Sequence, residues 1–270
     1  MDRHYEHHIA IRKDKLCPFM LRYNQRSFSA FCNWHLNIEV LLITEGTGII
    51  QYGADRLPLA AHDMIIVNSE IPHRLHSTEG LGLYCLIIDE SFCLENGLDT
   101  SMIHFKSNVR DAETEQLFRE AVTRWDIYSR ESSTLSAASL RCAILTLLIE
   151  LCSKHTYTDE IPSEKSTPSE AYIKCVLKYL NTHYTQPVTL DTLAKLCGIT
   201  KHHLAREFKK YMGQTVFTYL NILRCKNAEY CLSEGMSVTQ AACENGFESL
   251  SYFSRTYKKL MGVTPRSTRR

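Results

Sequence analysis

The 270-residue chain is long enough for two domains, and its 44% hydrophobic and 23% charged residues are those of a globular protein. The net charge of +1 conceals an asymmetry: residues 169–270 carry 15 Lys and Arg against 7 Asp and Glu, a net charge of +8, whereas residues 1–168 carry −7. A basic half predicts a polyanionic partner, with nucleic acid as the first candidate and a membrane surface as the second. No apolar run approaches the roughly 18–20 residues of a membrane-spanning helix, which excludes an integral membrane protein.

Eleven cysteines are scattered along the chain without a Cys-x-x-Cys pair. A zinc ribbon or a thioredoxin-type site therefore has no support. The first residues lack the apolar core of a signal peptide, and the cysteine count is odd. Both observations predict reduced thiols and a cytoplasmic location.

Residues 1–108 read as short strands separated by turns that contain Gly, Asn and Asp. Segments of β-branched and apolar residues recur at spacings typical of an all-β barrel or sandwich. The predicted strands are Ile38–Thr44, Gly48–Tyr52, Met64–Val67 and Leu83–Ile88. His4, His7 and His8 precede them, either in a solvated tail, which we favour, or in an arm over a pocket.

Helical periodicity replaces the strand pattern in residues 109–155. Apolar residues recur every three or four positions in Glu113–Tyr128 and in Leu135–His155, and the polar turn SRESS joins the two segments. We expect an antiparallel helical hairpin. The second helix is apolar over a wide arc, which favours burial on two sides: against the barrel and, in addition, at the subunit interface of a homodimer.

Residues 156–169 contain two prolines and no apolar periodicity, which predicts an exposed linker and a domain boundary. The remaining residues, 170–270, read as helices and tight turns. We therefore expect an α+β chain with a barrel in residues 1–108, a hairpin in residues 109–155 and a separate all-α domain.

A repeat organises the all-α domain. The decapeptide REFKKYMGQT at Arg206–Thr215 returns as RTYKKLMGVT at Arg255–Thr264, with six identical positions and an offset of 49 residues. Upstream, an Ala-x-x-x-Gly sequence that ends at Gly198 returns at Gly246 with an offset of 48. One structural unit therefore occurs twice, with one extra residue in the turn of the second copy.

Each copy has the features of a helix-turn-helix. In the first copy, Thr189 caps a short helix, Gly198 ends it, and Thr200 caps a second helix that has one apolar face. In the second copy, Ser237 and Gln240 form a capping box. An apolar-periodic helix between the copies is expected to hold them rigidly.

The exposed faces of the two second helices carry side chains suited to a DNA major groove. Arg can read guanine through two hydrogen bonds, small residues can contact a thymine methyl group, and Lys can neutralise phosphates. A solvated charged face is the simpler interpretation of one such helix, but two copies at matched positions favour DNA, with Phe208 and Tyr257 on the buried side. The predicted DNA-binding residues are His202, Ala205, Arg206, Lys209, Lys210, Leu250, Ser251, Ser254, Arg255 and Lys258.

The sequence GFESLSYFSRTYKKLMGVTP at Gly246–Pro265 closely resembles the signature of the AraC/XylS-type bacterial transcriptional regulators, and Tyr172–Arg266 fits their DNA-binding domain without a gap. The resemblance implies that two recognition helices enter successive major grooves of double-stranded promoter DNA, about 34 Å apart. In this family an aromatic residue usually follows the terminal Pro by three positions. Thr268 stands there instead, so we expect the last helix to be short or frayed.

Asn33–Gly46 and Pro58–His73 resemble the two motifs of a cupin barrel, the effector-binding domain of many members of this family. Enzymatic cupins bind a metal through His-x-His, a Glu and a later His, but Asn33 replaces the first His here. The remaining groups can hold a first-row metal, line an effector pocket or stabilise the barrel; we favour the pocket, and we predict no metal and no other cofactor. His62 and His76 are expected in turns. The predicted pocket residues, which suit a sugar or another small polar metabolite, are Trp34, His35, Glu39, His73 and Tyr84.

Together these features predict a cytoplasmic, non-enzymatic regulator that binds promoter DNA as a homodimer and responds to a small-molecule effector through the hairpin. Activation through RNA polymerase is the commoner behaviour of the family. The alternative is a metal-dependent cupin enzyme fused to a nucleic-acid-binding domain. A DNA-repair methyl acceptor has little support, because no cysteine lies in a metal-ligand cluster that would activate it.

Overall fold

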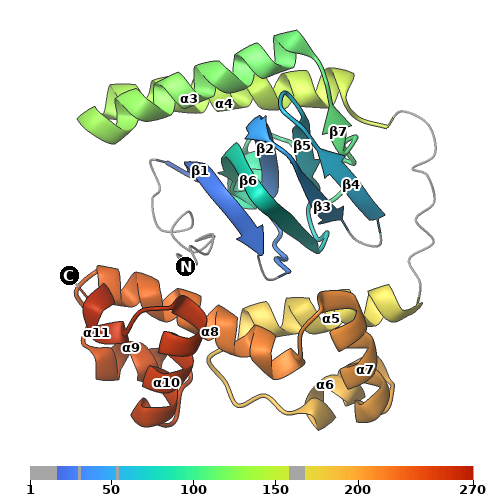
Figure 1. Cartoon of the computed structure of the whole chain (residues 1–270), viewed down its shortest axis with the longest axis vertical. Coiled ribbons are helices and arrows are strands. Elements are labelled where there is room, and N and C mark those ends of the chain that lie inside the picture. Colours follow the sequence, from blue (N-terminus) through green and yellow to red (C-terminus); the bar gives the residue numbers. More distant parts are fainter. Residues whose placement is uncertain (1–16, 30–31, 53–54, 158–167, 270) are drawn as a thin grey trace. The chain divides into compact units, whose positions relative to one another are not determined.

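The computed structural model describes residues 17–29, 32–52, 55–157 and 168–269. These residues fall into two compact units, an N-terminal unit up to residue 157 and a C-terminal unit from residue 168 (Figure 1). The division falls within the linker expected at 156–169. Most of that linker lies outside the described residues, as do His4, His7 and His8.

A seven-stranded antiparallel sheet forms the centre of the N-terminal unit. The order of hydrogen-bonded strands is β4-β3-β6-β2-β5-β7, and β1 also pairs with β6. Strand β6 organises the sheet, because its residues 81–88 pair with β1 on one side and with β2 on the other, while its residues 73–76 pair with β3. The strands are β1 (Phe19–Ser29), β2 (Ile38–Gly46), β3 (Gly48–Tyr52), β4 (Asp55–Leu59), β5 (Met64–Val67), β6 (His73–Ile88) and β7 (Asn108–Val109).

The two faces of the sheet bury different side chains, because successive residues of a strand point to opposite faces. In β2, Ile38 and Val40 belong to the apolar core that lies under two helices. Leu41 and Ile43 belong to a second core on the other face. Glu39 shares this second face and is 0% exposed. A buried carboxylate requires charged or hydrogen-bonding partners, so Glu39 marks a candidate site.

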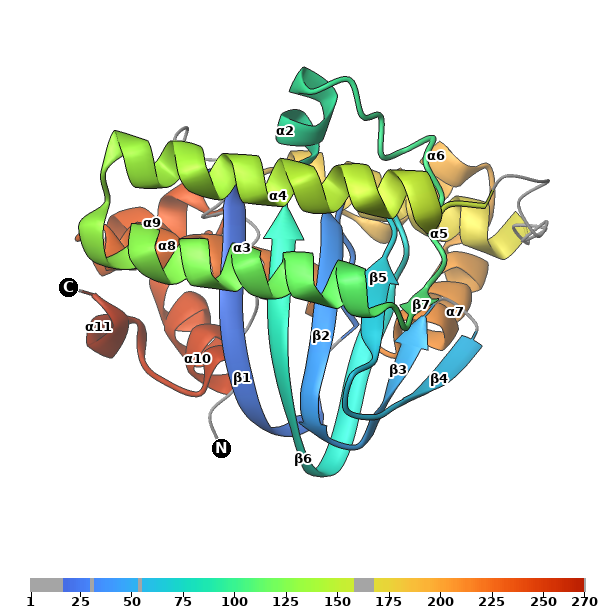
Figure 2. The ribbon, with the colours of Figure 1, turned by 90° about the horizontal axis from the view of Figure 1, so that it is seen from above.

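An antiparallel hairpin of α3 (Ala112–Glu131) and α4 (Thr134–Lys154) covers the first face of the sheet, crossing above β1, β6, β2 and β5 (Figure 2). The turn between the helices is tight, because Ser132 adopts a left-handed conformation with φ 49° and Ser133 forms a capping box at the start of α4. The hairpin is therefore the one predicted from the helical periodicity. A short helix, α2 (Glu90–Glu95), follows β6 and was not predicted.

Helix α4 contradicts the prediction that the chain contains no apolar segment long enough to cross a membrane. Among the described residues it is the helix that meets this requirement by length and composition. Polar residues and the charged Arg141 and Glu150 interrupt the apolar run in the sequence, but they are few enough for the helix to meet the requirement. One face of α4 packs on the sheet through residues that are at most 1% exposed: Leu140, Ile144, Leu147, Leu148 and Leu151.

The described part of the C-terminal unit is helical. Helices α6–α7 and α9–α10 are the two predicted helix-turn-helix units, and α8 is the long helix expected between them. The bounds of α6, α7 and α10 follow from side-chain caps at Thr189, Thr200 and Ser249, each of which accepts a backbone N–H of the first turn. The helices are α5 (Pro168–His183), α6 (Leu190–Cys197), α7 (Lys201–Met212), α8 (Val216–Ser233), α9 (Val238–Glu244), α10 (Leu250–Met261) and α11 (Pro265–Thr268).

Two histidines expected in turns have different positions. His62 does occupy a turn, with φ 70°. His76 lies inside β6 and pairs with Ile49, because β6 begins at His73, well before the predicted start of this strand at Leu83. The first half of β6 is polar and contains Gly80, so it lacks the apolar pattern by which a strand is predicted.

Candidate functional site

The two helix-turn-helix units have the same hydrogen-bonded turn. Gly198 is left-handed with φ 66°, and the residue after it donates its N–H to the carbonyl of Ala194 at 3.0 Å. Gly246 has φ 77°, and the residue after it donates to the carbonyl of Ala242, also at 3.0 Å. From the glycine to the next cap the first turn spans residues 198–200 and the second spans residues 246–249. The extra residue therefore lies where the repeat offsets predicted it.

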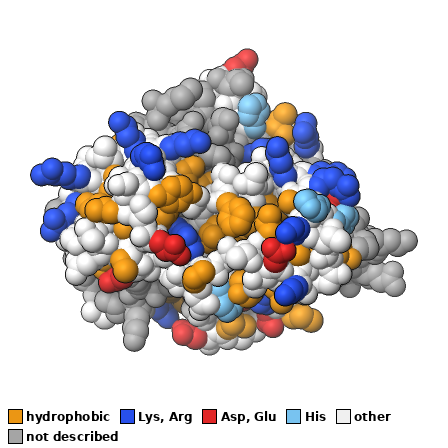
Figure 3. Space-filling view, turned by 90° about the horizontal axis from the view of Figure 1, so that it is seen from below, with side chains coloured by type: hydrophobic (Ala, Val, Ile, Leu, Met, Phe, Trp, Pro, Cys, Tyr) orange, Lys and Arg blue, Asp and Glu red, His pale blue; other side chains and the backbone are white. Residues whose placement is uncertain are grey.

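Helices α7 and α10 bury one face and expose the other. Phe208 and Tyr257, the matched aromatic residues of the repeat, are both 0% exposed. Figure 3 shows one side of the C-terminal unit, on which Lys and Arg side chains lie around and between hydrophobic side chains. The ten residues predicted to bind DNA are all exposed or half-buried: His202, Ala205, Arg206, Lys209, Lys210, Leu250, Ser251, Ser254, Arg255 and Lys258.

The matched arginines of the two helices differ in their neighbours. The side chain of Arg206 is 71% exposed; its Nε donates to Glu207 Oε1 at 3.2 Å, and its Nη2 lies 3.0 Å from His203 Nδ1. The hydrogen bond from Arg206 is the largest of the causes that hold the pKa of Glu207 below its ordinary value. Thr256 occupies the equivalent position in the second unit, so the residue after Arg255 is uncharged.

Arg224 of α8 connects parts of the C-terminal unit that are distant in sequence, a role that the sequence did not predict. Its Nε donates to the carbonyl of Tyr184 at 2.6 Å, and its Nη2 donates to the carbonyl of Gln186 at 2.8 Å. Its guanidinium carbon lies 5.8 Å from the ring centroid of Phe247, in the turn of the second helix-turn-helix. Because both acceptors are backbone carbonyls, the residue types at those positions gave no signal.

In the N-terminal unit, His35, Glu39 and His73 lie together. His35 precedes β2, Glu39 is within β2, and His73 begins β6. Nε2 of His35 is 3.0 Å from Glu39 Oε2, and Nε2 of His73 is 3.1 Å from the same oxygen. The three residues are 6%, 0% and 2% exposed. Their potential ligand atoms lie within 4.8 Å of one another, close enough to bind one metal ion.

Backbone carbonyls contact the other side of each imidazole. Nδ1 of His35 is 2.9 Å from the carbonyl oxygen of Asn37, and Nδ1 of His73 is 3.0 Å from that of Ile71. Burial lowers the pKa of His35, although Glu39 acts in the opposite direction. Burial alone would raise the pKa of Glu39, but the charge of His73 and the hydrogen bonds from both imidazoles hold it well below its ordinary value. The site therefore keeps an ionised carboxylate inside an apolar core.

The other two predicted pocket residues have different surroundings. Trp34 is buried next to His35 in the sequence, and its indole N–H donates to a backbone carbonyl at 3.1 Å. Tyr84 lies on the opposite face of the sheet, with its ring centroid 6.5 Å from that of Phe118 in α3, so the structure does not bring it to the other four. Its neighbour Cys85 faces the site instead and donates its thiol to Glu39 Oε1 at 3.4 Å. A single Cys in an apolar strand reads as core, which is why the sequence did not reveal it.

Comparisons with known proteins match both units. An AraC-like ligand binding domain model matches residues 15–148, and a helix-turn-helix domain model matches residues 193–270. The uncharacterized HTH-type transcriptional regulator YdeC of Bacillus subtilis is 24% identical over 250 residues, which cover 87% of this chain and 84% of that protein. The HTH-type transcriptional activator RhaS of Enterobacter sp. is 23% identical over 240 residues, which cover 86% and 84%.

The fold is also that of a solved structure. Unsaturated fatty acid bound ToxT from Vibrio cholerae superposes with a TM-score of 0.51 at 16% identity, covering 92% of this chain and 94% of that one. The two matched family models follow the order of the two units, first β-rich and then helical. The chain therefore belongs to the AraC/XylS-type transcriptional regulators.

Proposed function

We propose that this regulator binds promoter DNA through the exposed faces of α7 and α10, and that a small effector in the N-terminal unit controls the binding. One observation carries the choice of interface: two helices, each positioned by the same turn, expose an arginine at the same position of the repeat, Arg206 and Arg255. A charged face without function does not require this repetition.

The exposed residues divide by the DNA groups that they suit. Arg206 and Arg255 suit the two acceptors of guanine in the major groove. Ala205 and Ser254, which precede the arginines, are half-buried and short, so they allow the helices to approach the bases. Lys209 and the other basic residues in the last turns suit phosphates, which carry most of the affinity but no sequence information.

The interface is tested with DNA duplexes selected by the protein from a random library. Arg206→Ala and Arg255→Ala are each expected to weaken binding of the selected duplex by about 1–3 kcal/mol and to relax the sequence preference. Lys178→Ala, which removes an exposed charge from α5, serves as the control and is expected to retain the preference. Full retention of the preference in both arginine variants would show that these arginines do not read bases.

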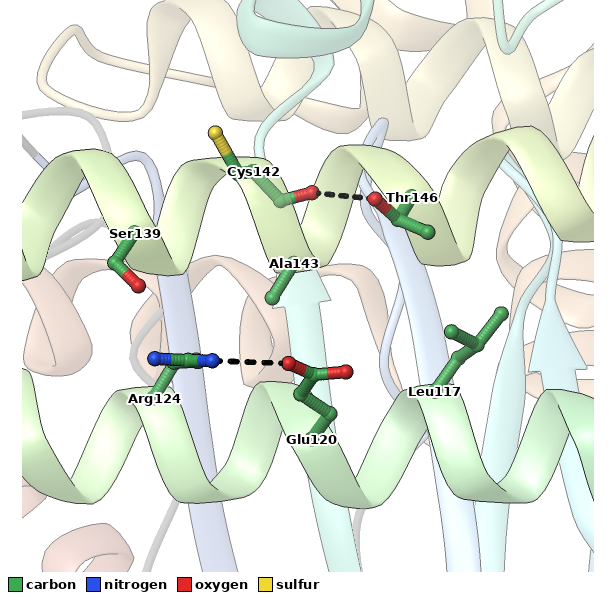
Figure 4. Close-up of a pocket in the computed structure, with 7 residues that line it drawn as sticks. All are labelled: Leu117, Glu120, Arg124, Ser139, Cys142, Ala143 and Thr146. Carbon is green, nitrogen blue, oxygen red and sulfur yellow. Dashed lines mark hydrogen bonds and ion pairs between the residues drawn. The ribbon is translucent and has the colours of Figure 1, made fainter.

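We propose further that the protein is a dimer formed through α4. The helix exposes an apolar stripe opposite its buried face, with Leu135 81% and Ile149 57% exposed and Cys142 between them. A shallow groove of about 180 Å³ separates α4 from α3 beside this stripe (Figure 4). An exposed apolar stripe on one helix supports a site of association here. In sedimentation equilibrium, Ile149→Glu is expected to convert a dimer into a monomer; a monomeric wild-type protein would contradict the proposal.

The sense of regulation and the effector class belong to the same proposal. The activator assignment draws on relatives that are named activators, such as RhaS. RNA polymerase as the partner and the cytoplasm as the location are proposed from the family resemblance. The polar group at His35, Glu39 and His73 suits two classes of effector: a sugar, through its hydroxyls, and a metal ion. The alternative of a metal-dependent enzyme draws on the same group, and the deep burial of its three residues disfavours access by a substrate and by a sugar alike.

A further inference from the structure

Two thiols meet where α5 packs against the first helix-turn-helix unit. Cys175 lies on α5, one turn after Tyr172 and therefore on the same side of that helix. Cys197 is the last residue of α6, and its thiol donates to the backbone carbonyl of Tyr172 at 3.7 Å. A hydrogen bond also joins the thiols of Cys175 and Cys197. Two contacts thus hold the sulfur of Cys197 against one turn of α5.

Access to solvent separates this pair from Cys93 and Cys152, two thiols that also lie near each other. Cys93 is 0% exposed in the apolar core under the hairpin, and mainly this burial raises its pKa to about 12. Cys175, by contrast, is exposed, and Cys197 is half-buried next to it. Burial is also the first cause that raises the pKa of Cys197 to about 11. A dissolved oxidant therefore reaches Cys175 first, while Cys197 stays protonated beside it.

An exposed thiol in contact with a second thiol favours disulfide formation. The thiolate of Cys175 attacks hydrogen peroxide, takes one oxygen as a sulfenic acid and releases water. The sulfur of Cys197 then attacks the sulfur of Cys175, the S–O bond breaks, and a second water leaves. In total, two thiols and one peroxide give one disulfide and two waters, and two electrons pass from sulfur to the peroxide. We infer that Cys175 and Cys197 form a reversible disulfide between α5 and α6 when a peroxide oxidises the protein.

The first turn of α5 contacts the side chains that surround Arg206. The hydroxyl of Ser169 donates to Glu207 Oε2 at 3.1 Å. The ring of Tyr172 packs edge-on against that of His203, with their centroids 6.5 Å apart. Glu207 and His203 are in turn the side chains within 3.2 Å and 3.0 Å of the guanidinium of Arg206. A disulfide that draws the end of α6 toward α5 therefore changes the surroundings of this arginine.

The disulfide also acts on the turn that positions α7. Gly198 directly follows Cys197, and the residue after this glycine donates to the carbonyl of Ala194 at 3.0 Å. A disulfide requires the two sulfurs to approach to about 2.05 Å, so the sulfur of Cys197 has to move toward Cys175. The turn is short, and the movement reaches the start of α7. The oxidised protein therefore binds DNA more weakly, an effect that rests on the proposed function.

Peptide mapping tests the disulfide in the full-length protein, which is first reduced and then treated with hydrogen peroxide. Mass spectrometry without reduction is expected to find the peptide of Cys175 linked to that of Cys197, with the loss of two hydrogens. Cys197→Ser is expected to leave a sulfenic acid on Cys175 that dimedone labels. Cys142→Ser, which removes an exposed thiol from α4, is the control and is expected to retain the link.

Two results would overturn the disulfide. One is the absence of the linked peptides from the oxidised wild-type protein. The other is a link between separate chains, which a mixture of ¹⁴N- and ¹⁵N-labelled protein distinguishes from a link within one chain. Equal labelling of Cys175 by dimedone in the wild-type protein and in Cys197→Ser would overturn the role of Cys197 as the second thiol.

The effect on DNA has its own test. Oxidation is expected to weaken binding of the selected duplex by about fivefold or more, and dithiothreitol is expected to restore it. Cys175→Ser is expected to keep the same affinity before and after peroxide. Unchanged affinity in the linked wild-type protein, or an equal loss in Cys175→Ser, would overturn the control of DNA binding. Failure of the reduced protein to prefer any duplex would instead overturn the proposed function, and the peptide map decides the disulfide independently of that result.

Discussion

Gly198 and Gly246, the equivalent glycines of the two turns, allow the same substitution to be compared in two environments. Gly198 has φ +66°, and a Cβ placed on it would meet no atom within 4 Å. Gly246 has φ +77°, and a Cβ placed on it would lie 2.6 Å from the carbonyl oxygen of Thr185 and 2.9 Å from its carbonyl carbon. Both alanine variants incur the left-handed penalty of about 1–2 kcal/mol. Only the second also has a steric conflict.

The conflict at Gly246 cannot be relieved by rotating a side chain, because the neighbouring atoms are backbone. Moving Thr185 also disturbs the carbonyls of Tyr184 and Gln186 on either side of it, which accept the two hydrogen bonds of Arg224. Overpacking costs about 1–3 kcal/mol. We therefore expect Gly198→Ala to destabilise the C-terminal unit by about 1–2 kcal/mol and Gly246→Ala by about 2–5 kcal/mol.

Hydrogen exchange measured by mass spectrometry is the suitable assay, since it reports the opening free energy of the C-terminal unit separately from that of the N-terminal unit. Peptides from α8 and α10 are expected to lose more protection in Gly246→Ala than in Gly198→Ala. Equal losses would refute the role assigned to the contact with Thr185. A larger loss in Gly198→Ala would refute the equivalence of the two turns.

Three further predictions concern other contacts. Arg224→Ala removes two hydrogen bonds from a charged donor, each worth about 1.5–3 kcal/mol. The exchange protection of the C-terminal unit should therefore fall by at least about 2 kcal/mol. Full rescue by Arg224→Lys would contradict the role of the guanidinium, which reaches two carbonyls at once. Burial opposes the ionisation of Asp63, but the hydrogen bond from Arg110 and one from a backbone N–H hold its pKa below the ordinary value. A lowered native pKa gives stability that is present above the unfolded pKa of about 3.9 and is lost as the pH falls through the native pKa. The decrease in urea midpoint caused by Asp63→Asn should therefore be largest near pH 7 and shrink below about pH 4. A decrease that does not depend on pH would refute the role of the ionised Asp63. Lys209→Ala and Lys258→Ala should each reduce the slope of log affinity against log salt by about 0.9 without changing the preference for the selected duplex, and an altered preference would show that these residues contact bases.

The starts of α6 and α7 were predictable to the residue because their signals are local. Thr189, Gly198 and Thr200 each act on the backbone within a few positions, and they cap or end these helices as predicted. The sheet was less predictable. Among the described strands, β1 is largely polar and pairs only with β6, and β4 contains Pro58 and pairs only with β3. Strands of this kind are held by backbone hydrogen bonds to one neighbour, and they need no apolar alternation.

The proposed effector site shows a different limit of prediction from sequence. Resemblance to cupin motifs identified His35, Glu39 and His73, but the assignment of Tyr84 depended on which face of β6 it occupies. A shift of one residue along a strand reverses that face, so Cys85 faces the site and Tyr84 does not. The backbone carbonyls that contact the two imidazoles could not be read from residue types, because every residue has a carbonyl.

Glu207 gives the arginines of the two proposed recognition helices different surroundings. In the proposed interface, a DNA acceptor has to compete with the carboxylate of Glu207 for the guanidinium of Arg206, since the two side chains are paired in the protein alone. Arg206 leaves Glu207 favourably only for a partner that offers hydrogen bonds of comparable strength, such as the paired acceptors of a guanine. Arg255 is followed by the uncharged Thr256 and faces no such competition from its neighbour. In the proposed interface, one acidic residue in one copy of a duplicated sequence thus sets a stricter requirement on the base that Arg206 reads than on the base that Arg255 reads.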